Sequence, residues 1–124
     1  MGEALSNKEK MENIVQKPWG YYEDIKREKT LVFKRIVINP ECRISLQKHE
    51  KRSEVWYVER GFCKITINDD IYKVSGGTSI NIPIEAIHRV ENLSKDHELV
   101  IFEVQQGICE EDDITRIEDD YARN

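Results

Sequence analysis

The sequence predicts an all-β domain, a sandwich or barrel built from seven or eight short strands. Two observations carry this prediction. From Leu31 onward, β-branched and aromatic residues occur in short runs, and turn-forming residues separate one run from the next. Helical periodicity is almost absent. The chain has 124 residues and no internal repeat, which is the length of a single domain.

The elements follow in chain order. The first 16 residues are polar and charged, and we expect them to form an arm, either a short helix or a disordered segment, ahead of a domain over 17–124. Lys17-Pro18-Trp19-Gly20 is typical of a turn held by an aromatic side chain. Trp19 and Trp56 are expected to pack in the core or at a sheet edge. The predicted strands are Leu31–Ile38, Arg43–His49, Val55–Glu59, Phe62–Ile67, Ile71–Val74, Thr78–Ile82, His88–Asn92 and Leu99–Val104.

Composition excludes several classes of protein. Hydrophobic residues make up 39% of the chain and charged residues 35%, with a net charge of −5. No apolar run is long enough to span a membrane, the start of the chain lacks a signal-peptide core, and no basic stripe indicates a nucleic-acid partner. The three cysteines form no CxxC pair, which favours a reducing cytoplasm over a disulfide framework.

The most informative polar residues lie between 45 and 54. On a strand, Gln47 and His49 project to the same face, because side chains alternate with a period of two. A hairpin would then bring Glu54 back beside His49, and His88 follows a proline turn further along. Two histidines, an amide and a carboxylate suit Zn²⁺, Mn²⁺, Fe²⁺ or Ni²⁺. From spacing alone, the alternative is a set of satisfied polar residues in a half-exposed sheet.

The order of these residues matches two spaced motifs. Gln47-x-His49-x₄-Glu54-x₆-Gly61 resembles the first cupin motif, with Gln in place of its first histidine. Gly77-x₅-Pro83-x₄-His88-x₃-Asn92 resembles the second, with Glu85 in place of a usual glycine. The resemblance implies a single cupin barrel, a double-stranded β-helix or jelly roll.

A narrower resemblance covers residues 17–123. The segments that carry it are Lys17-Pro18-Trp19-Gly20-Tyr21, Lys34-Arg35-Ile36-Val37, Arg43-Ile44-Ser45-Leu46-Gln47-x-His49, Ile82-Pro83-Ile84-x-Ala86-Ile87-His88-Arg89, Glu103-Val104-Gln105 and Asp112-Asp113-Ile114-x-Arg116-x-Glu118-Asp119-Asp120-Tyr121-x-Arg123. Together they resemble the type II mannose-6-phosphate isomerase (phosphomannose isomerase) domain. In that family the domain often forms the carboxy-terminal part of a bifunctional enzyme that also makes GDP-mannose for polysaccharide biosynthesis.

The resemblance implies a metal-dependent interconversion of mannose 6-phosphate and fructose 6-phosphate through an enediolate. Its metal ligands carry over onto Gln47, His49, Glu54 and His88, for one divalent ion, with zinc expected first and Mn, Fe, Co or Ni as alternatives. The family's functional arginines match the set Arg52, Arg116 and Arg123, which suit a phosphorylated hexose. A proton must also move between two carbons, and the candidate catalytic groups are Lys51, Glu103 and Arg116.

The chain departs from the family pattern at two positions, where Lys51 and Val55 stand in place of histidines. This departure favours, as an alternative, a non-catalytic module that binds a sugar phosphate or nucleotide sugar. Another cupin isomerase or a metal oxygenase is a further possibility. As cupins often pair through an edge sheet, we expect a homodimer.

The charge of the chain is unevenly distributed. Residues 1–34 carry +1 and residues 35–100 are neutral, whereas residues 101–124 hold eight acids and two arginines, a balance of −6. An acidic end is usually a solvated segment. Here it carries Arg116 and Arg123, which the resemblance assigns to the substrate, so we expect a structured flap over the barrel mouth.

Overall fold

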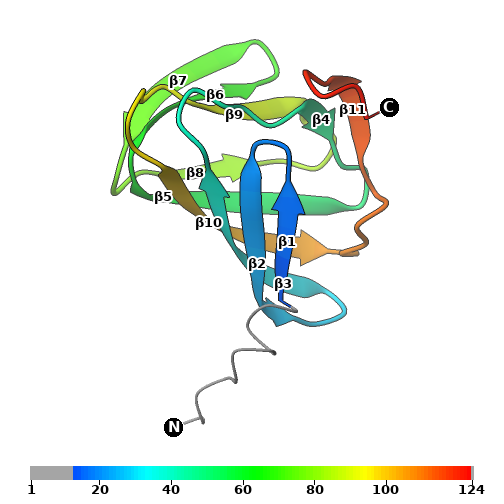
Figure 1. Ribbon diagram of the computed structural model, residues 1–124. Helices are drawn as coiled ribbons and strands as arrows, with labels where there is room; N and C mark the ends of the chain where they lie inside the picture. Colours follow the sequence, from blue (N-terminus) through cyan, green and yellow to red (C-terminus); the bar gives the residue numbers. More distant parts are fainter. Residues whose placement is uncertain (1–12, 124) are drawn as a thin grey trace, which may run out of the picture.

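The computed structural model describes residues 13–123, which form two antiparallel β-sheets packed face to face (Figure 1). No helix in this part of the chain is long and apolar enough to cross a membrane. The all-β prediction is confirmed. The strands are β1 (Ile14–Lys17), β2 (Gly20–Arg27), β3 (Leu31–Ile38), β4 (Leu46–Lys48), β5 (Arg52–Arg60), β6 (Phe62–Ile67), β7 (Asp70–Ser75), β8 (Ser79–Ile82), β9 (His88–Asn92), β10 (Leu99–Gly107) and β11 (Thr115–Glu118).

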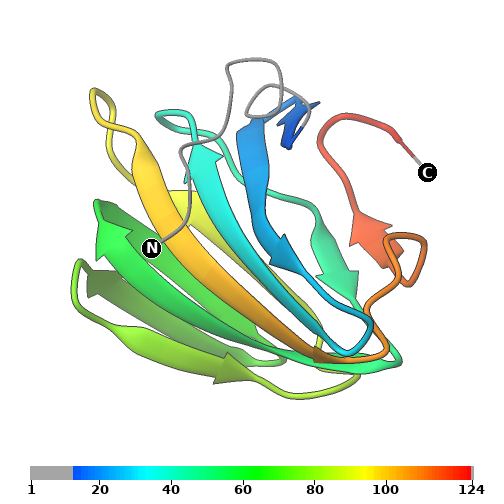
Figure 2. The ribbon, with the colours of Figure 1, turned by 90° about the horizontal axis from the view of Figure 1, so that it is seen from below.

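The larger sheet has six strands in the order β1-β2-β3-β10-β5-β8, and the smaller has five in the order β11-β4-β9-β6-β7. Figure 2 shows the long strands β3, β10 and β5 lying side by side in the larger sheet. Strand alternation decides which side chains enter the space between the sheets. On β5, Arg52, Glu54 and Trp56 are buried, whereas Val55 and Tyr57 are exposed on the outer face.

The apolar core fills the space between the two sheets. Trp19 and Trp56 both belong to it, with 7% and 1% of their surface exposed, as their predicted packing role requires. The other buried members are Tyr22, Ile36, Ile38, Ile44, Val58, Cys63, Ile65, Ile82, Ala86, Val90, Leu99 and Ile101.

Each predicted strand corresponds to a strand of the structure, but the bounds of several differ from the predicted ones. Three strands, β3, β6 and β9, have the predicted bounds. The prediction of a strand over Arg43–His49 is wrong in extent, because only Leu46–Lys48 joins a sheet and Arg43 makes a single bridge to Glu91. Three further strands, β1, β2 and β11, were not predicted from the sequence.

The amino-terminal boundary differs from the expected one. Residues 1–12 of the predicted arm lie outside the described residues, and Ile14–Lys17 form β1 rather than arm. The turn predicted at Lys17-Pro18-Trp19-Gly20 is confirmed, because it joins β1 to β2 with Lys17 opposite Gly20.

The predicted hairpin that brings Glu54 to His49 is wrong, although the two residues do meet. β4 belongs to the five-stranded sheet and β5 to the six-stranded sheet, so the chain crosses from one layer to the other after His49. His49 and Glu54 therefore face one another across the sandwich rather than along a hairpin.

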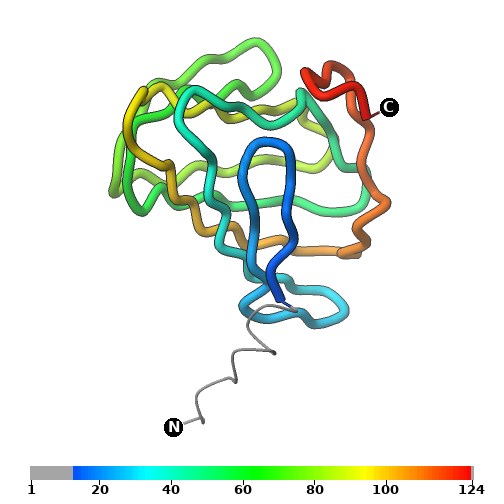
Figure 3. Tube along the Cα trace, viewed as in Figure 1, coloured from blue at the N-terminus to red at the C-terminus, as the bar shows by residue number. Residues whose placement is uncertain are grey.

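The acidic end of the chain is structured, as predicted. Figure 3 shows the chain leaving the end of β10 and running along one side of the molecule to β11 beside β4. Arg116 of β11 lies opposite Gln47 of β4 in that pairing. Asp113 ties this segment to the body, since its carboxylate accepts hydrogen bonds from the backbone N–H groups of Glu50 and Lys51, both at 3.0 Å.

Candidate metal centre and surrounding cavity

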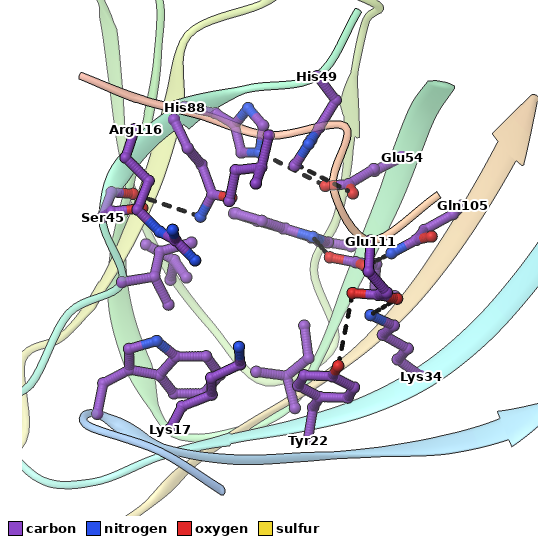
Figure 4. Close-up of a pocket in the computed structure, with 18 of the residues that line it drawn as sticks. Lys17, Tyr22, Lys34, Ser45, His49, Glu54, His88, Gln105, Glu111 and Arg116 are labelled. Atoms are coloured by element: carbon purple, nitrogen blue, oxygen red, sulfur yellow. Dashed lines mark hydrogen bonds and ion pairs between the residues drawn. The ribbon is translucent and has the colours of Figure 1, made fainter. Parts of the chain in front are cut away.

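A cavity of about 110 Å³ opens between the two sheets and carries most of the polar residues singled out in the sequence (Figure 4). It has room for several water molecules or part of a small ligand. Its lining combines buried polar groups with apolar core residues. The lining residues are Lys17, Trp19, Tyr22, Lys34, Ile36, Ile44, Ser45, Gln47, His49, Arg52, Glu54, Trp56, His88, Val90, Glu103, Gln105, Glu111, Ile114, Arg116 and Arg123.

Three of the four predicted metal ligands meet at one end of this cavity. His49 follows β4, Glu54 lies on β5 and His88 begins β9, and one ligand atom from each lies within 4.8 Å of the others. All three side chains are at least 95% buried. Buried polar groups of this kind need partners, and their convergence on one point is typical of a cation site.

Backbone carbonyls orient both imidazoles toward the cluster. His49 Nδ1 lies 2.6 Å from the carbonyl oxygen of Asp113, and His88 Nδ1 lies 2.9 Å from that of Ala86. Because a carbonyl oxygen only accepts hydrogen bonds, Nδ1 carries the proton in both rings. Each Nε2 is therefore left with a lone pair directed at the cluster, the arrangement that metal-binding histidines use.

The cluster also contains unpartnered buried atoms. Glu54 Oε1 and His88 Nε2 lie 3.5 Å apart, and neither has a hydrogen-bond partner among residues 13–123. The other side of Glu54 faces Arg52, whose Nε lies 3.1 Å from Oε2 and whose Nη2 lies 3.3 Å from His49 Nε2. Leaving two such atoms unpaired in the interior is costly, and a cation between them would satisfy both.

The electrostatics around His49 and Glu54 favour a neutral imidazole and an ionised carboxylate, the forms in which these side chains bind a metal. Burial lowers the pKa of His49, with Arg52 acting in the same direction and Glu54 opposing, so the ring is neutral near pH 7. Burial on its own raises the pKa of Glu54, but contact with His88 and the charges around it, including Arg52, hold it at about 2. The donor set is two imidazoles and one carboxylate, which fits zinc and the other divalent transition metals.

The remaining predicted site residues line the same cavity, with one exception. Gln47 borders it, and its Nε2 donates to the carbonyl oxygen of Ser45 at 3.4 Å. Arg116 and Arg123 reach it from the carboxy-terminal segment, and Arg123 is paired with Asp119 at 2.9 Å. Arg52 contacts Glu54 and His49, so it lies beside the candidate metal ligands rather than at an open anion site.

The exception is Lys51. Its side chain is exposed, lies outside the cavity lining and forms an ion pair with Glu110 at 3.4 Å. Val55, the other position where the family pattern has histidine, is 40% exposed on the outer face of the six-stranded sheet. Neither departure from the pattern therefore changes the lining of the cavity.

Glu103 is held at the centre of the cavity wall. Trp56 Nε1 donates to its Oε2 at 2.7 Å, and Gln105 Nε2 donates to its Oε1 at the same distance. Burial and the nearby charge of Glu54 raise the pKa of Glu103 to about 7, against the opposing charge of Lys34. A carboxyl group with this pKa can take up and release a proton near neutral pH.

Sequence reasoning missed a second charge cluster at the cavity, centred on the buried Lys34. Lys34 is 5% exposed, and its Nζ lies 2.9 Å from Glu111 Oε1 and 3.9 Å from the ring centre of Tyr22. Arg27 also contacts Glu111. The sequence could have indicated this cluster, because Lys34 occupies an inward-facing position of the apolar strand 31–38. A buried charge at such a position needs a partner of opposite charge.

These features define a class of protein: an all-β sandwich with the cupin fold, carrying a buried histidine–carboxylate cluster. Among solved structures, the capsular polysaccharide assembling protein CapF from Staphylococcus aureus matches with a TM-score of 0.73 and 22% identity, over 85% of this chain and 34% of that one. The cupin domain of Schizosaccharomyces pombe Cnp3 matches with a TM-score of 0.66 and 9% identity, over 70% and 60%. The cupin fold expected from the two motifs is confirmed.

The family follows from the sequence comparisons. Residues 4–119 match the family model described as "Mannose-6-phosphate isomerase C-terminal". The mannose-1-phosphate guanylyltransferase ManC of Salmonella typhimurium is 39% identical over 114 residues, which is 91% of this chain and 24% of that protein. The chain belongs to the mannose-6-phosphate isomerase C-terminal family. It spans about a quarter of the length of the curated relative.

Proposed function

We propose that this chain is a metal-dependent aldose–ketose isomerase that interconverts mannose 6-phosphate and fructose 6-phosphate. The observation that carries the proposal is the buried cluster of His49, Glu54 and His88 at one end of a cavity whose wall is rich in basic residues. Five basic and three acidic side chains line it, and this excess suits a phosphorylated sugar.

The proposed metal site uses His49, Glu54 and His88, with Gln47 as a fourth ligand from the neighbouring strand. When bound, the cation would act as a Lewis acid toward the oxygens at C1 and C2 of the sugar. The protein's own part is to keep Glu54 ionised, which Arg52 does at 3.1 Å, and to aim both imidazole lone pairs inward. Zinc is the ion expected first.

Glu103 is the proposed proton carrier between the two carbons. Its pKa of about 7 allows both protonation states near neutral pH, and Trp56 and Gln105 fix its position. Lys51, another of the three predicted candidates, lies outside the cavity lining and pairs with Glu110, so it is not part of the proposed machinery. Arg116 and Arg123 are proposed to bind the phosphorylated sugar.

The alternative of a sugar-phosphate binding module without turnover was favoured by the missing histidines. Because Lys51 and Val55 both lie outside the cavity lining, that departure supports the alternative less than the sequence suggested. A location in the cytoplasm and a homodimeric assembly stay predictions.

A coupled assay that follows conversion of mannose 6-phosphate into fructose 6-phosphate tests the proposal. The protein is stripped with a chelator and reloaded separately with Zn²⁺, Mn²⁺, Co²⁺, Ni²⁺ or Fe²⁺. We expect turnover with at least one ion, none in the stripped protein, and none in Glu103→Gln, which should still bind the metal. Absence of turnover with every ion would contradict the proposal, and ligand-dependent thermal stabilisation without turnover would favour the binding module.

A further inference from the structure

The turn between β1 and β2 presents Lys17 to the cavity, at a distance along the chain from every residue of the proposed metal site. The turn is firmly held. Trp19 is 7% exposed, and its carbonyl oxygen accepts a hydrogen bond from the N–H of Asn39 at 2.9 Å. Gly20 packs so closely on β3 that an added Cβ would lie 2.1 Å from the carbonyl oxygen of Val37. The backbone of Lys17 is therefore fixed beside the cavity wall.

Most charges in the cavity are paired. Arg52 lies 3.1 Å from Glu54, Lys34 lies 2.9 Å from Glu111, and Arg123 lies 2.9 Å from Asp119. Lys17 and Arg116 differ. Within residues 13–123, neither has a carboxylate at ion-pair distance, and the Nε atom of Arg116 is buried without a hydrogen-bond partner.

These two unpaired cations share one space. Figure 4 shows Lys17 and Arg116 reaching into the cavity from opposite walls, with Lys17 across the cavity from His49, His88 and Glu54. Burial lowers the pKa of Lys17, and the charges of Arg123 and Arg116 lower it further, against the opposing charge of Glu111. An anion between the cations would relieve their repulsion and satisfy the buried Nε.

We propose that Lys17 is a phosphate-binding residue, which holds the phosphoryl group of the substrate together with Arg116, across the cavity from the metal ligands. The identity of the sugar rests on the proposed function, whereas the anion subsite rests on the two cations alone. The arrangement selects for phosphorylated sugars, because an uncharged hexose would leave both cations without a counterion. It also fixes which end of the sugar faces the metal centre.

The test compares Lys17→Gln, Lys17→Arg and the matched control Lys26→Gln, whose lysine lies exposed on β2, outside the cavity lining. Binding of inorganic phosphate to the intact protein is measured by isothermal titration calorimetry, with thermal unfolding as a check of folding. We expect Lys17→Gln to bind phosphate about 10- to 100-fold more weakly, with Lys17→Arg close to wild type and Lys26→Gln unchanged.

Steady-state kinetics with mannose 6-phosphate provide a second readout. In Lys17→Gln, the KM should rise by a similar factor while kcat stays within about threefold, the signature of lost binding. If wild type binds phosphate through Lys17 but shows no turnover, the inference stands and the proposed function fails. The inference is overturned if wild type binds no phosphate, or if folded Lys17→Gln binds it as tightly as wild type does.

Discussion

At the scale of single residues, the candidate centre depends on atoms that have no partner inside the protein. His88 Nε2 and Glu54 Oε1 are buried, 3.5 Å apart and unsatisfied within the described residues. His49 Nε2 contacts Arg52, so a metal there would compete with a guanidinium for one imidazole lone pair. His88 thus supplies the ligand atom that is most freely available.

His88→Ala should therefore abolish stoichiometric metal binding and weaken affinity by at least about 100-fold, because it removes one of three strong donors. The measurement is elemental analysis of the purified protein with a competition titration against a chromophoric chelator. His97→Ala is the matched control, since His97 is an exposed histidine outside the cavity lining. Equal metal content in His88→Ala and wild type would exclude this site.

Glu103 leads to a prediction about pH and stability. Burial and Glu54 raise its pKa to about 7, with Lys34, Gln105 and Trp56 opposing, against an ordinary value of 4.5. Between these two values the folded state binds the proton more tightly than the unfolded state, so wild-type stability falls as pH rises through the window. Above pH 7 the ionised, buried carboxylate costs on the order of 1–3 kcal/mol.

Glu103→Gln has no such charge to bury. In metal-free protein, the stability of this variant relative to wild type should increase from pH 5 to pH 8, as measured by urea unfolding at each pH. Chelator is present throughout, because a bound cation would itself lower the pKa of Glu103. A difference between variant and wild type that does not change with pH would contradict the raised pKa.

At the scale of elements, the β1–β2 turn is held in place by close backbone packing. A Cβ on residue 20 would lie 2.1 Å from the carbonyl oxygen of Val37, which is backbone and cannot rotate away. Gly20→Ala should destabilise the protein by about 3–5 kcal/mol, measured by thermal or urea unfolding. Gly77→Ala is the control. Its φ is +95° with no atom within 4 Å of the added Cβ, so it should cost only about 1–3 kcal/mol. Equal costs at the two positions would contradict the close packing.

The carboxy-terminal segment positions His49, one of the proposed metal ligands. Asp113 accepts hydrogen bonds from Glu50 and Lys51 through its carboxylate, and from His49 Nδ1 through its backbone carbonyl. Asp113→Ala should release this segment from the loop after β4 and lower metal affinity about 10- to 100-fold. Asp112→Ala, which removes a neighbouring exposed carboxylate, should leave metal affinity unchanged. An unchanged affinity in Asp113→Ala would show that the carboxylate of Asp113 does not contribute to the position of His49.

At the scale of the whole molecule, local patterns predicted much of the fold but not its layering. The strands 31–38, 62–67 and 88–92 follow from runs of β-forming residues between clear turns. β2 was missed because the polar sequence of residues 23–28 hides its alternation, and β11 because its four residues hold two charges. Sheet membership depends on pairing between distant segments, which no local pattern encodes; this is why β4 and β5 were wrongly joined in a hairpin.

Of the candidate site, the sequence predicted the ligand cluster but only some of the neighbouring residues that line the cavity. Motif order was enough to bring His49, Glu54 and His88 together, since their positions follow from the fold as a whole. The sequence did not indicate that position 55 faces outward or that Lys51 leaves the cavity, because both depend on where β5 begins. Lys17 was interpreted only as part of a turn, since its contact with the cavity arises from the packing of β1 and β2 beside β3.

We propose that the buried cluster of His49, Glu54 and His88 makes this chain a metal-dependent isomerase of a phosphorylated hexose. The most direct test follows mannose 6-phosphate by NMR in D₂O with metal-loaded wild type, chelator-stripped wild type and His88→Ala. We expect fructose 6-phosphate to form only with the metal-loaded wild type and to carry solvent deuterium at C1, because the protein group that takes the proton from C2 exchanges it with D₂O before it returns a deuteron to C1. Equal conversion by the stripped protein, or no conversion by wild type with any of the divalent ions, would contradict it.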